Sequence, residues 1–134
     1  MIKEQKKIFL VDDNEANLIT YKNILKSRYT VYPVSLASKM FELLKHVKPD
    51  LILLDIEMPD MNGYEAAKML KSNDLHKDIP FIFLSGHFDP VKITEGMDLG
   101  ACDFYQKPLI SSLLLKRLEA FFSLIDYETA NQGE

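Results

Sequence analysis

The stretch from Leu51 to Gly63, with the sequence LILLDIEMPDMNG, constrains the fold more than any other part of this chain. Four apolar residues follow Pro49 and Asp50 without interruption and stop at Asp55. Such a run indicates a short strand that is buried on both faces, as in a parallel sheet. The segment after it contains Pro and Gly and is typical of a loop. Asp55 is therefore expected at the point where a buried strand leaves the sheet.

Three further apolar runs end in polar residues in the same way. Asp12 and Asp13 follow the run at 8–11, Ser85 follows the run at 81–84, and Lys107 closely follows Phe104-Tyr105. If the strands are parallel, these side chains meet at the carboxyl edge of the sheet, where α/β proteins bind their ligands. Clustered carboxylates repel one another unless a cation lies between them. An oxygen-rich site of this kind suits hydrated Mg²⁺.

Strand and helix patterns alternate five times along the chain. Strands are expected at 7–11, 30–34, 51–54, 80–84 and 103–105, and helices at about 14–27, 38–48, 64–72, 90–99 and 111–125. Right-handed crossovers then place helices on both faces of a parallel sheet. Pro33 lacks a backbone donor and marks an edge strand. The pattern predicts an α/β fold of the flavodoxin-like, doubly wound type, with five parallel strands in the order 2-1-3-4-5 and five helices.

The size and composition of the chain fit one ordinary domain. It has 134 residues, of which 47% are hydrophobic and 27% charged, so a single core is expected. We expect the domain to cover residues 1–125 and to be followed by a frayed polar tail, or the start of a linker, at 126–134. The net charge of −4 gives no electrostatic reason to bind nucleic acid. A single cysteine, Cys102, and the absence of an apolar run of membrane-spanning length favour a cytoplasmic protein.

Helical spacing assigns apolar residues to core and surface. In the final helix the expected core stripe consists of Leu114, Leu118, Phe121 and Ile125, with Leu113, Leu115 and Phe122 beyond it. Apolar residues beyond a core stripe indicate either a partner surface or a broad stripe under the sheet edge. In the helix at 64–72 we expect Met69 to face inward together with Ala67 and Leu70.

The order of these motifs resembles the receiver domain of bacterial two-component response regulators, over about residues 6–125. The resemblance rests on Asp12-Asp13, on Asp55 followed by Met58-Pro59 and Gly63, on Ser85-Gly86, and on Gly100-Ala101 before Lys107-Pro108. It implies that the chain takes part in a phosphorelay. A sensor histidine kinase or phosphotransfer protein would donate a phosphoryl group, and the chain would act as a phosphoacceptor switch. Its only catalytic chemistry would be self-catalysed transfer and slow autodephosphorylation.

The resemblance also implies roles for individual residues. Asp55 would be the phosphoacceptor, and Lys107 and Ser85 would contact the phosphoryl group. Mg²⁺ or Mn²⁺ would be held by Asp12, Asp13, Asp55 and the backbone carbonyl of Glu57, with Asp12 acting mainly through water. The Lys107-Pro108 peptide bond is cis in this family, and the same is expected here.

Switching would follow phosphorylation in the same family. Ser85 would move toward the phosphoryl group, and Phe104, three residues before Lys107, would fill the space that Ser85 leaves. The output would lie on the face formed by the helix at 90–99, the strand at 103–105 and the final helix, which is also a surface for a homodimer. Glu57 and His87 lie two residues past Asp55 and Ser85 and are expected to tune the lifetime of the phosphoryl group.

Two other functions compete with this interpretation. A metal-dependent phosphohydrolase would use an aspartyl nucleophile and a second acid two residues later, as Glu57 is, but it needs a substrate pocket that these short loops do not provide. A degenerate receiver would bind partners without phosphorylation, which the intact Asp12, Asp13, Asp55, Ser85 and Lys107 disfavour. No direct contact with nucleic acid or with a membrane is expected.

Overall fold

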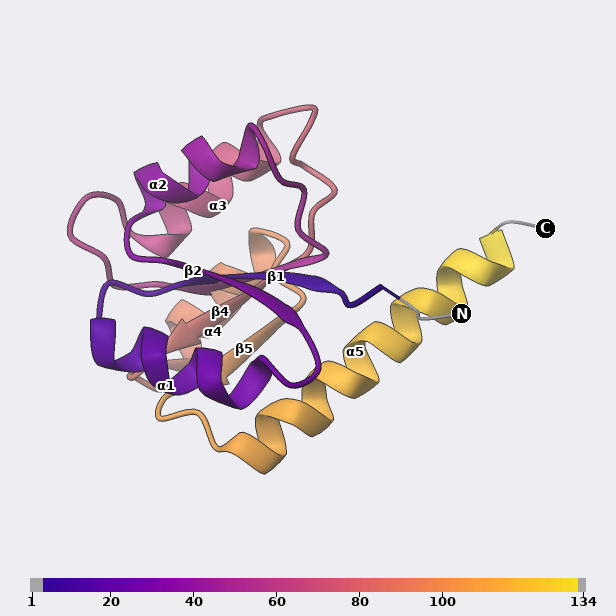
Figure 1. Cartoon of the computed structure of the whole chain (residues 1–134). Helices are drawn as coiled ribbons and strands as arrows, with labels where there is room; N and C mark the ends of the chain where they lie inside the picture. Colours follow the sequence, from indigo (N-terminus) through magenta and orange to yellow (C-terminus); the bar gives the residue numbers. More distant parts are fainter. Residues whose placement is uncertain (1–3, 133–134) are drawn as a thin grey trace.

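The computed structural model describes residues 4–132 and shows a parallel sheet between two layers of helices (Figure 1). The elements are β1 (Lys7–Val11), α1 (Glu15–Leu25), β2 (Thr30–Val34), α2 (Ala37–Leu44), β3 (Leu51–Asp55), α3 (Gly63–Lys71), β4 (Phe81–Ser85), α4 (Pro90–Asp98), β5 (Asp103–Gln106) and α5 (Ser111–Gln132). The strand order is β2-β1-β3-β4-β5 and every pairing is parallel. The predicted fold class is therefore confirmed.

Alternation along the central strands divides the core into two halves. Phe9 and Ile52 point to the side covered by α2 and α3, whereas Ile8 and Leu51 point to the side covered by α1 and α5. Residues 8–11, 51–54 and 81–84 are completely buried, because both faces of these strands are covered. This double burial explains why the strands read as uninterrupted apolar runs in the sequence.

The ends of the strands fix where the functional side chains emerge. β3 and β4 each continue one residue further than expected, so that Asp55 and Ser85 are their last residues. The edge position of β2 agrees with its Pro33, which stands opposite Leu10 of β1. Asp55 belongs to the central strand of the sheet and is therefore surrounded by protein on both sides.

Side chains from the loops define where the helices begin. Asn14 accepts a hydrogen bond from the backbone of Asn17 at the start of α1, and Asn62 and Glu65 form a capping box at the start of α3. Asp89 caps α4 just before Pro90. The loops after β1, β3 and β4 therefore each end at a fixed position, where the next helix begins.

Three sequence expectations about the helices are wrong. The side chain of Met69 is 46% exposed and does not face the core. In α5 the third core residue is Phe122, at 6% exposure, whereas Phe121 is only half-buried. The segment from Asp126 to Gln132 is helical and does not form the expected frayed tail. The Lys6 ammonium pairs with the Asp126 carboxylate at 2.8 Å.

The last turns of α5 extend beyond the body of the domain (Figure 1). Within residues 4–132, no helix is both long enough and apolar enough to cross a membrane.

The backbone of the strand end leaves no room for a side chain at Gly63 in the loop after β3. A Cβ atom on Gly63 would lie 2.6 Å from the carbonyl oxygen of Asp55 and 2.8 Å from the Cα of Ile56. Both are backbone atoms, so the strand end would have to shift. We expect Gly63→Ala to lower the free energy of unfolding by roughly 1–3 kcal/mol in urea denaturation.

Gly86 is the matched control for this substitution. A Cβ atom there would meet nothing within 4 Å, so Gly86→Ala should change stability by less than about 0.5 kcal/mol. Equal destabilisation by the two substitutions would contradict the assignment of Gly63 as a packing constraint on Asp55.

Candidate functional site

Two neighbouring aspartates lie at the end of β1 in different environments. The Asp12 side chain is completely buried, whereas Asp13 is exposed. The carboxylate of Asp12 accepts hydrogen bonds from the backbone N–H of Asn14 at 2.9 Å and from the Asn17 side chain at 3.3 Å. The start of α1 therefore fixes Asp12 from one side and leaves Asp13 to face the outside.

Asp55 supplies a third carboxylate from the end of β3. It is 3% exposed, and its Oδ1 accepts a hydrogen bond from the backbone N–H of Glu57 at 3.3 Å. The N–H of Gly63 donates to the carbonyl of Ile56 at 2.7 Å, which folds the loop back onto the strand end. The backbone on either side of Asp55 is thereby held in place.

Lys107 joins the two buried carboxylates. Its Nζ lies 2.9 Å from Asp12 Oδ2 and 3.1 Å from Asp55 Oδ1, and the side chain is 16% exposed. Its backbone N–H donates to the carbonyl of Ser85 at 2.7 Å, so the end of β5 is tied to the end of β4. The expected cis peptide bond between Lys107 and Pro108 is confirmed.

The charges at this edge perturb one another. Burial raises the pKa of the Asp55 carboxyl to about 7; the Lys107 ammonium opposes this rise, and the Asp12 carboxylate adds to it. Burial also acts to lower the pKa of Lys107, but its hydrogen bond to Asp12 and the charge of Asp55 outweigh that effect and raise it. The single ammonium thus does not fully compensate the buried carboxylates.

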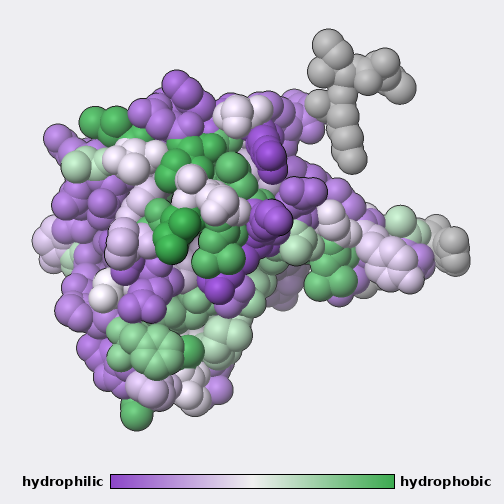
Figure 2. Space-filling view, turned by 90° about the horizontal axis from the view of Figure 1, so that it is seen from below, coloured by the Kyte–Doolittle hydropathy of each residue, from purple (hydrophilic) through white to green (hydrophobic). Residues whose placement is uncertain are grey.

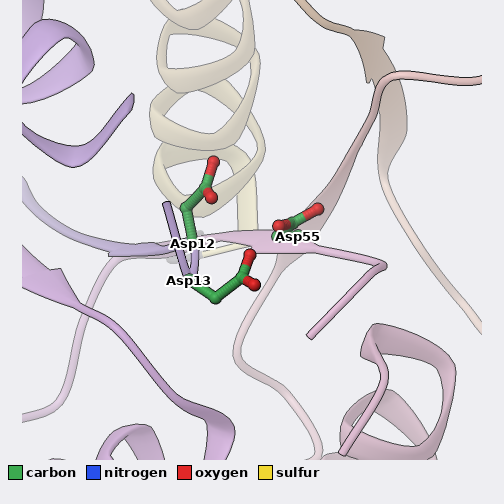
Figure 3. A group of neighbouring side chains, drawn as sticks. All are labelled: Asp12, Asp13 and Asp55. Carbon is green, nitrogen blue, oxygen red and sulfur yellow. The ribbon is translucent and has the colours of Figure 1, made fainter. Parts of the chain in front are cut away.

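The donor set of this edge fits a hard divalent cation. Asp12, Asp13 and Asp55 each offer a carboxylate oxygen, and these oxygens lie within 4.8 Å of one another. Figure 3 shows the three side chains side by side, two from the segment that ends β1 and one from the end of β3. Carboxylate oxygens at this spacing favour Mg²⁺ over softer metals, because hard cations prefer oxygen ligands.

Ser85 ends β4, the strand next to β3, and Phe104 lies in β5 beyond it. The hydroxyl of Ser85, which is 4% exposed, donates to the carbonyl of His87 at 3.2 Å and accepts from the N–H of His87 at 3.1 Å. Phe104 is half-buried, and its ring centroid lies 6.4 Å from that of Phe83. The loop after β4 therefore holds the hydroxyl of Ser85 through backbone atoms.

Glu57 and His87, which lie on the loops after β3 and β4, contact each other through their side chains. His87 Nε2 lies 3.4 Å from Glu57 Oε1, and the two side chains are 74% and 60% exposed. An exposed pair of this kind contributes little to stability.

Two contacts of the site went unnoticed in the sequence. Asn17 donates to Asp12, which its position in the first turn after an Asp-Asp pair hinted at only weakly. The hydroxyl of Tyr64 donates to the carbonyl of Lys92 at 2.7 Å, and its ring packs edge-on against Phe83 at 5.1 Å. Tyr64 follows Gly63 at the start of α3, so this helix start also contacts α4.

Comparison with known proteins gives one consistent result. The family model of the response regulator receiver domain matches residues 8–119. The sensory transduction protein BceR of Halalkalibacterium halodurans is 32% identical over 129 residues, which is 96% of this chain and 54% of BceR. A probable cyclic di-GMP phosphodiesterase of Vibrio cholerae is 36% identical over 83% of this chain and 25% of its own length.

A solved structure shows the same architecture. The chemotaxis protein CheY4 of Vibrio cholerae superposes with a TM-score of 0.82 at 26% identity, covering 87% of this chain and 98% of that one. The chain thus spans about half the length of BceR, a quarter of the phosphodiesterase and nearly all of CheY4.

The raised pKa of Asp55 predicts a pH dependence of stability in the absence of divalent cations. In the folded state the Asp55 carboxyl keeps its proton up to about pH 7, whereas in the unfolded chain it loses the proton near its ordinary pKa of 3.8. The free energy of unfolding therefore falls as the pH rises from about 4 to about 7. Relative to Asp55→Asn, which cannot titrate, the free energy of unfolding of the wild type should fall by on the order of 1–4 kcal/mol.

The measurement is urea denaturation in EDTA at a series of pH values. Asp13→Asn removes an exposed carboxylate from the same cluster and should keep the wild-type slope. If the curves of wild type and Asp55→Asn run parallel between pH 4 and 7, Asp55 does not titrate in this window.

Proposed function

The chain belongs to the response regulator receiver domain family, and from this premise we propose that it is a phosphorelay switch with Asp55 as its phosphoacceptor. The observation that carries the assignment is the position of Asp55. It is a buried carboxylate at the end of the central strand, 3.1 Å from the Lys107 ammonium and next to the Asp12 and Asp13 carboxylates. Receiver domains act in phosphorelays with histidine kinases, so the donor is a phosphohistidine on a kinase or phosphotransfer protein.

The proposed reaction is a single phosphoryl transfer. A carboxylate oxygen of Asp55 attacks the phosphorus of the phosphohistidine, the P–N bond breaks, and the imidazole keeps the electron pair and takes up a proton. The product is an acyl phosphate on Asp55. Lys107 would pair with a phosphoryl oxygen, because its ammonium already lies against Asp55.

The metal ligands would come from the same edge. Asp13 and Asp55 would bind Mg²⁺ or Mn²⁺ directly, with the backbone carbonyl of Glu57, and Asp12 would act mainly through water. When bound, the cation neutralises negative charge on the carboxylates and on the transferred group. The exposure of Asp13 supports its role as a direct ligand, and the additional hydrogen bonds that Asp12 accepts from Asn14 and Asn17 support a less direct role for Asp12.

The switch would begin at Ser85. Its hydroxyl is held by the backbone of His87 and would exchange these bonds for a phosphoryl oxygen. Phe104 would then move into the vacated space, and α4, β5 and α5 would carry the change to a partner. A homodimer on this face and a cytoplasmic location stay predictions, as does the domain boundary near residue 125. The process that the switch controls also stays a prediction.

Phosphorylation of Asp55 is directly testable. Incubation with acetyl phosphate and Mg²⁺ should add one phosphoryl mass to the wild type and none to Asp55→Asn, because the amide lacks the nucleophilic oxygen. Intact-protein mass spectrometry reads this out, with Mg²⁺ omitted as the control. A phosphorylated Asp55→Asn variant would refute the assignment, and sustained hydrolysis of a phosphate ester would favour a phosphohydrolase instead.

Glu57 and His87 are proposed to set the lifetime of the acyl phosphate, since their exposed side chains pair at 3.4 Å on the two loops that follow Asp55 and Ser85. Replacing both by Ala should leave labelling of Asp55 intact and change the decay rate several-fold, on the order of 1 kcal/mol in barrier. The decay of phosphorylated protein at fixed Mg²⁺ measures this. Superimposable decay curves for the wild type and the double variant would remove these residues from the mechanism.

A further inference from the structure

Helix α4 is held on the domain by very little of its own surface. Of its nine residues only Gly96 is buried, and this residue has no side chain. α1 and α5, which lie on the face seen in Figure 2, instead bury large side chains against the sheet, among them Tyr21, Leu118 and Phe122. Because packing of apolar side chains is what usually fixes a helix on a sheet, the position of α4 depends on a few specific contacts.

Gly96 allows α4 to lie directly on two aromatic rings. A Cβ atom at this position would lie 3.0 Å from the ring of Phe83 and 3.2 Å from the ring of Tyr64. These two rings pack edge-on with their centroids 5.1 Å apart, and the ring of Phe104 lies 6.4 Å from that of Phe83. α4 therefore rests on one ring from α3 and one from β4, and the ring from β4 also neighbours the aromatic residue proposed to move in the switch.

One hydrogen bond joins this pair of rings to the backbone of α4. The Tyr64 hydroxyl donates to the carbonyl oxygen of Lys92 at 2.7 Å, an ideal distance for an O–H donor. Lys92 belongs to the first turn of α4, which directly follows the loop after β4. Burial raises the pKa of the Tyr64 hydroxyl, and the charges of Glu95 and Asp89 add to this rise, so the hydroxyl keeps its proton at neutral pH and remains a donor.

The Tyr64 end of this bond is fixed to the end of β3. The backbone N–H of Gly63, the residue before it, donates to the carbonyl of Ile56 at 2.7 Å, and Gly63 lies against the backbone of Asp55. The capping box at the start of α3 holds the same turn. Tyr64 therefore keeps a constant position relative to Asp55.

The Lys92 end depends on the segment that the proposed switch rearranges. The Ser85 hydroxyl holds His87 by two hydrogen bonds of 3.1 and 3.2 Å, and only two residues separate His87 from α4. One of them, Phe88, is 69% exposed, so its ring does not anchor the loop. If Ser85 exchanges these bonds for a phosphoryl oxygen, the first turn of α4 loses its nearest connection to β4, whereas Tyr64 stays in place.

We propose that Tyr64 is a positioning residue of the switch, whose hydroxyl holds α4 in the unphosphorylated arrangement and releases the Lys92 carbonyl when α4 moves. This inference rests on the proposed function, because it names a bond that opposes the proposed movement. It adds a second connection between the site and α4, through the loop after β3, to the one through Ser85 and Phe104. A bond made in only one of two states favours that state by its own free energy, so this bond keeps the switched arrangement scarce before phosphorylation.

Hydrogen exchange of the unphosphorylated chain tests whether the bond holds α4. Tyr64→Phe keeps the ring and removes only the hydroxyl, so the amides of α4 should exchange about fivefold faster, while those of β3 keep their wild-type rates. Tyr32→Phe is the matched control, because it removes a hydroxyl from a ring that also packs edge-on against a phenylalanine, Phe9 at 5.5 Å, on the edge strand β2. Wild-type exchange of α4 in Tyr64→Phe would overturn the proposal.

Gly96→Ala tests the position of α4 without changing Tyr64. The added methyl group would press on the rings of Phe83 and Tyr64 and displace the helix, so exchange of α4 should again become faster. Helix propensity alone predicts the opposite, since alanine stabilises a helix relative to glycine. Slower exchange of α4 in this variant would therefore overturn the proposal, because α4 would not be held against these rings.

Binding of beryllofluoride in the presence of Mg²⁺, which imitates a phosphoryl group on a carboxylate, tests the connection to switching. If the bond exists only in the unphosphorylated arrangement, Tyr64→Phe should bind beryllofluoride about fivefold more tightly than the wild type and Tyr32→Phe, as followed by fluorine NMR. Equal affinities of the three proteins would refute the role of Tyr64 and leave the proposed function intact. A wild type that binds no beryllofluoride would refute the proposed function itself, and the role of Tyr64 in switching with it.

Discussion

The carboxylates of Asp12 and Asp55 are almost completely removed from solvent and share a single ammonium, that of Lys107, which lies within 3.1 Å of both. This imbalance of buried charge is the constraint on which the rest of the site depends. Burial raises the pKa of Asp55, and the neighbouring Asp12 carboxylate adds to this rise, so the single ammonium of Lys107 does not fully compensate the two carboxylates. The edge therefore suits a further cation, whose positive charge the proposed phosphoryl group would also require.

The fold imposes this arrangement through the central strand. Because both faces of β3 are covered, the residue at its end cannot turn to solvent as a strand-end aspartate on an open sheet would. The loop after it is folded back by Gly63, whose lack of a side chain allows contact with the backbone of Asp55 and Ile56. The burial that destabilises the charged Asp55 is thus enforced by the packing that stabilises the domain, so the local loss of stability falls on the carboxylate that is proposed to carry the function.

The fold could be predicted because strand and helix patterns alternate along the sequence. The side chains that meet at the candidate site could be predicted because they stand at the ends of parallel strands. A buried parallel strand is an uninterrupted apolar run, and its last residue can be read directly, as for Asp55. The contacts of Lys107 with Asp12 and Asp55 follow only from the parallel topology, since 95 and 52 residues separate the partners in the chain.

The faces of the helices were less predictable from the sequence. Phe121 and Phe122 differ by one residue in a helix whose two apolar faces lie side by side, and hydropathy does not decide which of them enters the core. Residues 126–132 are mostly polar, which is why a frayed tail was expected there. The pairing of Lys6 with Asp126, which anchors the helical extension, joins opposite ends of the chain and therefore leaves no local pattern in the sequence.

The candidate site and the start of α5 are joined by a very short segment. Lys107 contacts both buried carboxylates, and Pro108, Leu109 and Ile110 line a hollow of about 340 Å³ beside β5 and α5. The backbone of Lys107 is also bonded to the carbonyl of Ser85, so the two residues proposed to contact a phosphoryl group are linked to each other and to the hollow. If phosphorylation repositions Lys107, the hollow beside β5 and α5 must change with it. Linkage then requires the converse, because any partner that prefers one shape of this hollow alters the free energy of phosphorylation by the same amount.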